Sequence, residues 1–490
     1  DGGSTWQNNS TFNGLGAGSY TVKVRYRTTD NCEVTHGSTI ILTVPASPSI
    51  DNVVDVNPTD CGVNDGKITI TPTTNELFLY SIDNGSTWYP DSLFLNLTTG
   101  DYNVMIANLD TVCHEWYANN PVKIILNTES DSLALKSFYD TNNGVNWNYT
   151  TSSYSYETYL YGNSVGNVPN AGNAWDFNAP MDTWHGVITD VNGCVSSLRL
   201  VNMNITGTIP DLNLPSLTLL RIKDDLVTGT IPDFSKLLSL THLSLVNNEL
   251  DGVVTDFSNL PNLIFFEANG NNFTGIPNFS NLHNLRELDL DANNITGTIP
   301  DFVSFGNVES IHIDNNELTG SVPDFTNLGK IRHLYLHTNN LDGNIPNFSD
   351  NLPFLEHLMI DNNNLTFEDI VGSFSLNNSL ATLYRYSPQA NFGTSDTTYV
   401  ATGSSHTIDL GIDAGVTTSS YAWSLNGSPL VPPTTVNKRV LNNISVSDTG
   451  TYTVTVSNSV VTGLTLTGAS YTVKFYENEI CGNGDDDDGD

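Results

Sequence analysis

Residues 285–300 read Leu-Arg-Glu-Leu-Asp-Leu-Asp-Ala-Asn-Asn-Ile-Thr-Gly-Thr-Ile-Pro. The spacing of the leucines, the first asparagine and the Gly-x-Ile-Pro segment returns along the middle of the chain. The glycines of these segments stand 22 or 23 residues apart, at Gly207, Gly229, Gly252, Gly275, Gly297, Gly320 and Gly343. A pattern with a fixed interval in this range predicts a solenoid, in which each repeat forms one coil and packs on its neighbours.

The repeated pattern, L-x-x-L-x-L-x-x-N-x-L followed by G-x-I-P, resembles the leucine-rich repeat, and its second part resembles the plant-type subclass. Departures are local. Gly252 is followed by Val-Val-Thr, and Gly275 is followed by Ile-Pro with one residue missing. The resemblance implies a binding or structural role for the domain.

Three columns of the repeat are expected to be structural. The leucines should point inward, and an asparagine column should bond backbone groups of the neighbouring coil. Asp225 takes the asparagine position in an early coil. The asparagines are Asn248, Asn271, Asn293, Asn316, Asn339 and Asn363. A third column should fill the convex side with Phe234, Phe257, Phe279, Phe302, Phe325 and Phe348.

The ends of the array need caps. Residues 131–148 predict a short helix capped by Asp131 and carrying Leu133, Leu135 and Phe138. With Trp147, Trp184 and Val187 covering the first coil, this region resembles the N-terminal cap of bacterial and plant leucine-rich repeat proteins. Plant caps often hold a disulfide, but only Cys194 is present here, so a buried thiol is expected. Leu380, Leu383 and Tyr386 predict a last strand.

Two stretches near the start match each other: Trp6 aligns with Trp88, Gly18 with Gly100 and Tyr20 with Tyr102. Phe12 aligns likewise with Phe94, and Cys32 with Cys113. The strand after each glycine alternates with period two, which predicts a half-buried strand. Cys61, which precedes the second copy, is expected to form a disulfide with Cys113, and Cys32 is expected to pair upstream of residue 1. The copies resemble the SprB-type repeats of very large surface adhesins of Bacteroidota.

Residues 395–476 resemble an immunoglobulin-like sandwich. Trp423 is expected on a central strand, and the Asp448-Thr-Gly-Thr-Tyr452 segment resembles a tyrosine corner. Val454 stands where the second cysteine of that family would be, so the disulfide of the family is absent.

The chain is therefore expected to be mainly β and multidomain. We predict a partial SprB-type module at 1–46, a complete one at 47–127, a capped leucine-rich repeat at 128–393 and an immunoglobulin-like sandwich at 394–476. Residues 477–490 are predicted to be an acidic linker that starts a further module. Asp486, Asp488 and Asp490 there have the alternate spacing of calcium ligands, and the competing interpretation is a solvated linker.

Asp and Glu total 53 against 17 Lys and Arg, for a formal charge of -36. Nucleic acid and anionic membranes are poor partners for such a chain because both require a basic patch. No run of 18 apolar residues is present, so no membrane insertion is expected. The sequence holds no motif of a hydrolase, metalloprotease, P-loop or dinucleotide-binding enzyme, so no catalytic activity is expected.

Side chains that alternate with the inward leucines are expected to face solvent on the concave side of the solenoid. The later coils gather a patch of His312, Asp314, His333, Tyr335, His337, His357 and Asp361. The patch has three competing interpretations: a recognition surface for a protein or glycan, ordinary solenoid surface, or a metal site.

The favoured hypothesis is a segment of a large secreted or cell-surface bacterial protein that mediates adhesion or protein and glycan binding through this concave face. One alternative is a subunit of an extracellular filament or sheath that contacts copies of itself. Another is the non-catalytic part of a larger secreted enzyme. Calcium is the only cofactor expected.

Overall fold

A computed structural model of the chain describes residues 6–26, 33–44, 47–61, 63–126, 128–149, 157–158, 164–165 and 168–476. The chain divides into two compact units, residues 1–127 and 128–490. Both units are built mainly from β-strands, as the sequence predicted. Asp486, Asp488 and Asp490, Cys32 and Cys481 lie outside the described residues.

The first unit consists of short antiparallel strands. Its buried core gathers apolar side chains from the strands of residues 47–126, including Ile68, Ile70, Val104 and Ile106. The strands are β1 (Gly18–Tyr20), β2 (Lys23–Arg25), β3 (Glu33–Thr35), β4 (Ile40–Leu42), β5 (Ile50–Val56), β6 (Gly66–Pro72), β7 (Leu79–Ser81), β8 (Leu93–Leu97), β9 (Gly100–Tyr102), β10 (Met105–Ala107), β11 (His114–Trp116) and β12 (Val122–Ile124).

The two matched sequence copies share a backbone feature. The strand predicted after the glycine is broken at the same place in both, into β1 and β2 in one copy and β9 and β10 in the other. The hydroxyl of Tyr20 donates to the carbonyl of Gly16 at 2.6 Å, and the hydroxyl of Tyr102 donates to the carbonyl of Thr98 at 2.9 Å. Each tyrosine therefore bonds back to the residue four positions earlier.

The cysteines differ from the predictions. Cys113 is a free, exposed thiol in the turn between β10 and β11, so the predicted Cys61–Cys113 disulfide is wrong. Cys61 is buried and disulfide-bonded. Cys194 is disulfide-bonded too, so the prediction of a reduced thiol there is also wrong. That prediction rested on the lack of a second cysteine near residue 194 in the sequence, and sequence proximity does not decide pairing.

The second unit opens with a cap built from α1 (Glu129–Thr141), the short helical turns at Gly144–Asn146 and Met181–Thr183, and β15 (Val187–Thr189). The short strands β13 (Glu157–Thr158) and β14 (Ser164–Val165) pair within it. Leu135, Phe138, Trp147, Trp184 and Val187 are buried in the cap, as predicted, whereas Leu133 is exposed.

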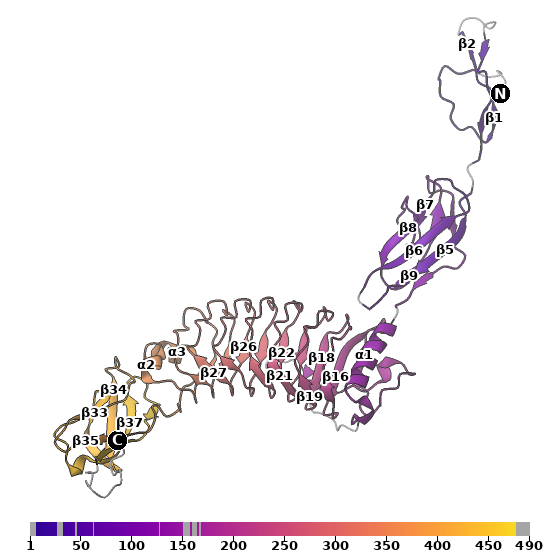
Figure 1. Cartoon of the computed structure of the whole chain (residues 1–490). Coiled ribbons are helices and arrows are strands. Elements are labelled where there is room, and N and C mark those ends of the chain that lie inside the picture. Colours follow the sequence, from indigo (N-terminus) through magenta and orange to yellow (C-terminus); the bar gives the residue numbers. More distant parts are fainter. Residues whose placement is uncertain are drawn as a thin grey trace. The chain divides into compact units, whose positions relative to one another are not determined.

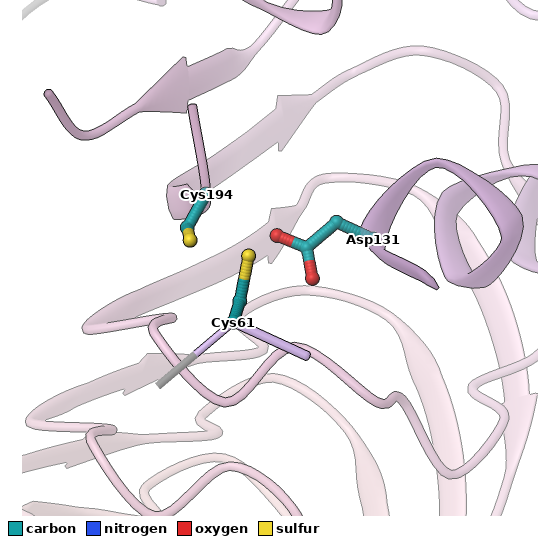
Figure 2. A group of neighbouring side chains, drawn as sticks. All are labelled: Cys61, Asp131 and Cys194. Carbon is teal, nitrogen blue, oxygen red and sulfur yellow. The ribbon is translucent and has the colours of Figure 1, made fainter. Parts of the chain in front are cut away.

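Asp131 does not cap α1, because the helix begins two residues earlier. Its carboxylate instead accepts the backbone N–H of Val195 at 2.7 Å, which ties the first turn of α1 to the first parallel strand of the solenoid. Asp131 and Cys194 consequently lie next to one another in this cap (Figure 2). The buried carboxylate thus has a structural role.

The solenoid itself carries two rows of parallel strands (Figure 1). The first row, with antiparallel β15 at its start, forms a ten-stranded sheet of β16 (Val195–Val201), β18 (Leu219–Lys223), β20 (His242–Ser244), β22 (Phe265–Glu267), β24 (Glu287–Asp289), β26 (Ser310–His312), β28 (His333–Tyr335), β30 (His357–Met359) and β31 (Leu383–Arg385). The second row consists of β17 (Thr206–Thr208), β19 (Leu226–Gly229), β21 (Glu249–Val253), β23 (Asn272–Gly275), β25 (Thr296–Gly297), β27 (Glu317–Gly320) and β29 (Asn340–Leu341).

The predicted columns are buried between these rows. The amide nitrogen of Asn293 donates to the carbonyls of Ala268, Leu290 and Asp291 at 3.1–3.2 Å, and its oxygen accepts the N–H of Phe273. The asparagines therefore bond backbone groups of the preceding coil, as predicted. The phenylalanines are also buried, and rings of adjacent coils stack with centroids 6.4 Å apart, as between Phe302 and Phe325.

The end of the solenoid carries two short helices, α2 (Phe367–Val371) and α3 (Phe374–Leu380), before β31. The predicted last strand is present, but Leu380 belongs to α3 and Tyr386 follows the strand. None of the described helices has the length and apolar character needed to cross a membrane.

The last part of the second unit is again antiparallel in most of its pairings, and its apolar side chains join the same buried core as the coils. Trp423 is buried on β34, opposite Val454 of β37, and the hydroxyl of Tyr452 donates to the carbonyl of Asp448 at 2.7 Å. The strands are β32 (Asp396–Val400), β33 (His406–Asp409), β34 (Ser419–Leu425), β35 (Ser428–Thr434), β36 (Lys438–Leu441), β37 (Gly450–Asn458), β38 (Thr465–Thr467) and β39 (Tyr471–Phe475).

Candidate functional site

The candidate site lies on the outer side of the ten-stranded sheet, where side chains alternate with those of the leucine core; we call this side the sheet face. Its register follows from the strand pairing. One column runs His242, Phe265, Glu287, Ser310, His333, His357 and Leu383. A second column runs Arg199, Arg221, Ser244, Glu267, Asp289, His312, Tyr335, Met359 and Arg385.

In the last coil, strand β31 pairs with β30 over residues 383–385. Tyr384 pairs with Leu358, which belongs to the inward-facing set, and Arg385 takes the position next to Met359 on the sheet face. In this coil helix α3 stands directly before β31, where the other coils have an irregular segment before the strand. The shift of one residue exchanges the inward and outward sets, as expected for a structure with a side-chain period of two.

Three imidazoles and one phenol, those of His312, His333, His357 and Tyr335, form a chain of ring contacts across three strands. We call these four residues, together with His337, the ring cluster. The rings of His312 and Tyr335 meet edge to face with centroids 4.4 Å apart, and those of His333 and His357 lie 4.7 Å apart. The Tyr335 hydroxyl lies 2.8 Å from Nδ1 of His357. The fifth member, His337, follows β28 and is near enough to His312 to affect its pKa. The structure thus brings four of the five aromatic residues of the predicted patch into ring contact, with His337 close to them.

Only one of the two aspartates of the predicted patch contacts the ring cluster. Oδ2 of Asp314 lies 3.2 Å from Nε2 of His337, which joins this aspartate to the ring cluster. Asp361 instead forms a salt bridge of 2.7 Å with Arg385 and has a fully buried side chain. It therefore anchors Arg385, and its carboxylate is not presented to solvent.

The sheet face is less open than the alternation pattern suggested. His333 is only 8% exposed and Asp314 is buried, whereas His312, Tyr335, His337 and His357 are half-buried. Long side chains in adjacent columns cover one another because parallel strands lie only about 4.8 Å apart. A ligand would consequently meet ring edges held in place by their neighbours.

Burial also changes the charge of the ring cluster. It lowers the pKa of His312 to about 4, and the nearby His333 and His337 add to this shift. The pKa of His333 is lowered mainly by burial as well. Both His312 and His333 are therefore neutral at pH 7.

The coils before the ring cluster carry carboxylates that the sequence analysis did not single out. Glu267, Glu287, Asp289 and Asp291 lie on or beside β22 and β24, and we call them the acidic stripe. Burial raises the pKa of Glu287 to about 7, with a further contribution from the charge of Glu267. Burial and the charge of Asp291 raise the pKa of Asp289 well above its usual value. In a chain with 53 acidic residues, no sequence signal distinguished these four.

The geometry does not support the metal interpretation of the patch. Among the described residues, no three potential metal ligands of the sheet face have their ligand atoms within 4.8 Å of one another. The tentative calcium ligands Asp486, Asp488 and Asp490 lie outside the described residues and stay a prediction.

Comparisons with known proteins agree with the repeat assignment. Residues 261–304 match the family described as Leucine Rich repeats (2 copies). No curated protein sequence matches the chain. Similar solved structures include the plant peptide hormone receptor RGFR1 in complex with RGF2, with 29% identity, a TM-score of 0.34, and coverage of 39% of this chain and 31% of the receptor.

Two further structures are similar over a longer part of the chain. One is the Arabidopsis receptor kinase HAESA ectodomain in complex with an IDA peptide hormone, with 24% identity, a TM-score of 0.41, and coverage of 55% and 42% of the two chains. The other is InlP of Listeria monocytogenes, with 26% identity, a TM-score of 0.37, and coverage of 57% and 78%. The chain thus spans less than half of the plant receptor chains. Together with the observed coils, the matched repeats show that this chain contains a leucine-rich repeat domain.

Proposed function

We propose that the chain is a segment of an extracellular surface protein that binds a protein or peptide through the ring cluster of its sheet face. One observation carries this proposal: four aromatic side chains from three adjacent strands, His312, His333, Tyr335 and His357, form a chain of ring contacts on one surface of the sheet, and His337 lies just after the middle strand. No enzymatic family is indicated by the comparisons, and the arrangement offers contacts for binding.

The packing of the ring cluster suits recognition. Tyr335 is held by a hydrogen bond to His357 and by the edge of His312, so little conformational freedom remains to be lost when a partner binds. Aromatic side chains with a polar tip are enriched among residues that dominate binding energy. The ordering cost of the surface is therefore low, and its contact area is large.

Disulfide bonding supports an extracellular location. Cys61 and Cys194 are disulfide-bonded, and structural disulfides persist mainly in oxidising environments.

The modules that precede and follow the solenoid in the sequence share a tyrosine whose hydroxyl donates to the carbonyl four residues earlier, as for Tyr20, Tyr102 and Tyr452. The hydrogen bond from the Tyr452 hydroxyl to the Asp448 carbonyl resembles the tyrosine corner of immunoglobulin-like domains. This resemblance supports our proposal of an immunoglobulin-like sandwich at 394–476. We propose adhesion as the role of this modular arrangement.

The test uses peptides and proteins displayed on a surface and selected against the folded chain. The variant Tyr335→Ala/His337→Gln removes the phenol and keeps a hydrogen-bonding group beside Asp314. We expect binding of selected ligands to weaken by about 2 kcal/mol or more if these residues are anchors. The control variant Glu317→Ala/Asn340→Ala changes two exposed residues of the second strand row and should bind as the parent does.

Equal binding by the parent and the ring-cluster variant would place recognition elsewhere. Self-association of the parent in sedimentation equilibrium, abolished by the same variant, would favour the filament alternative, in which copies of the chain contact one another. Both variants should show the thermal unfolding temperature of a folded protein before their binding is compared.

A further inference from the structure

We propose that Arg385, on the last strand of the sheet face, is a subsite for a carboxylate group of the ligand. This inference rests on the proposed function, because it names the chemistry of one part of the ligand that the ring cluster binds. Both an acidic side chain and the carboxyl terminus of a peptide carry this group, and the experiment separates the two sources.

The strand register places Arg385 near the ring cluster. Tyr335 of β28 pairs with Met359 of β30, and Met359 pairs with Arg385 of β31, so the three residues follow one another in a single column. Strand β31 is the last strand of the ten-stranded sheet. Nη1 of Arg385 lies 3.7 Å from Sδ of Met359, so the guanidinium extends along the sheet face toward β30. One ligand can therefore contact both Tyr335 and Arg385.

Asp361 holds the guanidinium in place. Nη2 of Arg385 donates to Oδ2 of Asp361 at 2.7 Å, and Nδ2 of Asn362 donates to the same oxygen at 3.0 Å. A free arginine side chain loses much conformational freedom when a partner orders it. Here that freedom is already restricted by folding, so the cost of ordering Arg385 on binding is low.

The two members of this ion pair differ in exposure. The side chain of Asp361 is 0% exposed, whereas that of Arg385 is 47% exposed. The pair of Arg332 and Glu356 is different, because its two side chains are 43% and 42% exposed. A ligand that approaches Arg385 consequently meets the cationic member of the pair, while the protein covers the anionic member.

The guanidinium keeps hydrogen-bond donors for a ligand although its charge is paired. It has five N–H groups in a planar fork. Among the described residues, one of these groups bonds to Asp361 and another makes the long contact with the sulfur of Met359, which is a weak acceptor. A carboxylate can accept two parallel N–H bonds from such a fork. Arg385 would then be shared between Asp361 on its buried side and the ligand on its exposed side.

A carboxylate fits this site better than a phosphate. Phosphate groups are generally recognised by clusters of basic side chains. Arg332, which precedes β28, is engaged by Glu356 and is therefore not available to complete such a cluster. The formal charge of the chain is -36, so a doubly charged anion meets more repulsion than a singly charged one. A single arginine with a planar fork matches a single planar carboxylate.

The spacing of strands predicts where the carboxylate stands in the ligand. Tyr335 on β28 and Arg385 on β31 are in the same column, two strand intervals apart. Two intervals correspond to about 10 Å, which an extended peptide crosses in about three residues. The carboxylate should therefore stand about three positions from the residue that contacts Tyr335.

The experiment selects random twelve-residue peptides, displayed with free carboxyl termini, on the intact chain. The selection is repeated on Asp361→Asn/Arg385→Gln, in which two amides replace the ion pair so that no buried charge is left alone. The control, Asp211→Asn/Lys236→Gln, makes the same change in an exposed ion pair located between the two strand rows.

Fluorescence anisotropy then measures the affinity of selected peptides for all three proteins. Each peptide is measured as selected, with every aspartate and glutamate replaced by the corresponding amide, and with an amidated carboxyl terminus. The second form removes side-chain carboxylates, and the third removes the terminal one.

We expect peptides selected on the parent and the control to lose about tenfold or more in affinity when one of the two kinds of carboxylate is removed. The same peptides should lose about as much on the Asp361→Asn/Arg385→Gln variant, and their copies without that carboxylate should bind all three proteins equally. Loss with the amide side chains identifies an acidic residue as the source, and loss with the amidated terminus identifies the carboxyl terminus.

Thermal unfolding near the parental temperature shows that the Asp361→Asn/Arg385→Gln variant folds. If it does not fold, Arg385→Lys takes its place, because lysine leaves a cation beside Asp361 and removes the planar fork. The same dependence on the carboxylate is expected to weaken in this variant.

The other outcomes separate the two proposals. Selected peptides that need Tyr335 and His337 but bind equally without any carboxylate would overturn the subsite and leave the proposed function standing. Acidic peptides that need Arg385 but bind the ring-cluster variant normally would overturn the proposed function's anchors. Inorganic phosphate that displaces the peptides from the parent more effectively than acetate would make Arg385 a phosphate site and overturn the inference. A library that yields no peptide above an unrelated protein would overturn both.

Discussion

Asp225 and Asn248 occupy the same position in successive coils, and only Asn248 carries the NH2 group that the position requires. The amide nitrogen of Asn248 donates to three backbone carbonyls at 2.9–3.2 Å. Oδ1 of Asp225 accepts two backbone N–H groups at 2.8 and 2.9 Å, but its Oδ2 is buried without a partner. Burial raises the pKa of Asp225 to about 6.

We predict that Asp225→Asn stabilises the solenoid at pH 7.5 by about 2 kcal/mol, because it replaces a buried carboxylate with an amide that can donate. The folded-state pKa of Asp225 lies above that of an unfolded aspartate, so the folded chain holds more protons between pH 4 and 6. The stability contributed by this group therefore falls as pH rises through that window. Urea unfolding at pH 4.5 and 7.5 should show the variant's advantage growing with pH.

The reverse substitution two coils further is the control. Asn271→Asp places a carboxylate where Asn271 donates to carbonyls of Leu245 and Ala268, and it should destabilise the solenoid at pH 7.5. Destabilisation by Asp225→Asn would contradict the interpretation of the column.

His312 is predicted to make the solenoid sensitive to acid. Its folded-state pKa of about 4 lies below that of an unfolded histidine, so the unfolded chain binds the extra proton between pH 6.5 and 4. Stability from this group is present above pH 6.5 and is lost as pH falls. We expect His312→Gln to remove up to about 3 kcal/mol of the loss between pH 7 and 4. Identical pH profiles of unfolding free energy for parent and variant would disprove this.

Phe302 is predicted to be a main packing residue of the solenoid. It is fully buried and stacks on Phe305 with centroids 4.8 Å apart. Phe302→Ala should reduce the unfolding free energy by about 3–5 kcal/mol because it leaves a cavity between coils. Val303→Ala, at an exposed neighbouring position, should change it by less than about 0.5 kcal/mol. If Phe302→Ala and Val303→Ala had the same unfolding midpoint in urea, the stacked phenylalanines would not be a main source of the solenoid's stability.

Cys113 is predicted to react with maleimide in the native protein, because its thiol is free and exposed. Cys61 and Cys194 should remain unlabelled until the protein is reduced, since both are disulfide-bonded. Peptide mapping by mass spectrometry identifies the labelled residues. Cys113→Ser should leave the unfolding free energy unchanged within about 0.5 kcal/mol, and label on native Cys61 would show that the bonding differs.

The sequence predicted the coils because their interval is fixed and because each column has a repeated chemical role. It did not predict the backbone of the phenylalanine column, where Phe302 adopts a φ of 49° and Phe257 one of 52°. The spacing of apolar residues predicts which side chains are buried. The backbone φ of each phenylalanine depends instead on how the chain turns between strands, which the spacing does not reveal. The left-handed conformation is unfavourable for such residues and is maintained by their packing.

The candidate site was predicted only in part for the same reason. Alternation along each strand located His333 on the sheet face, but its burial depends on the side chains of adjacent coils. The pairing of Asp361 with Arg385 could not be foreseen, since α3 shifts the register of β31. Cysteine pairing also depends on distances that the sequence does not contain.

The asparagine column has a consequence for how this protein can change over generations. Each amide bonds backbone atoms of its own coil and of the preceding one, as Asn293 does with Ala268 and Leu290. Backbone atoms are the same whatever the neighbouring side chains are. Duplication or loss of one whole coil therefore leaves these bonds matched, and the sheet face lengthens or shortens by a single strand. Residues of the ring cluster and Arg385 do not belong to the asparagine column. Substitutions there leave the backbone hydrogen bonds of that column intact, so ligand preference can change while the scaffold stays the same.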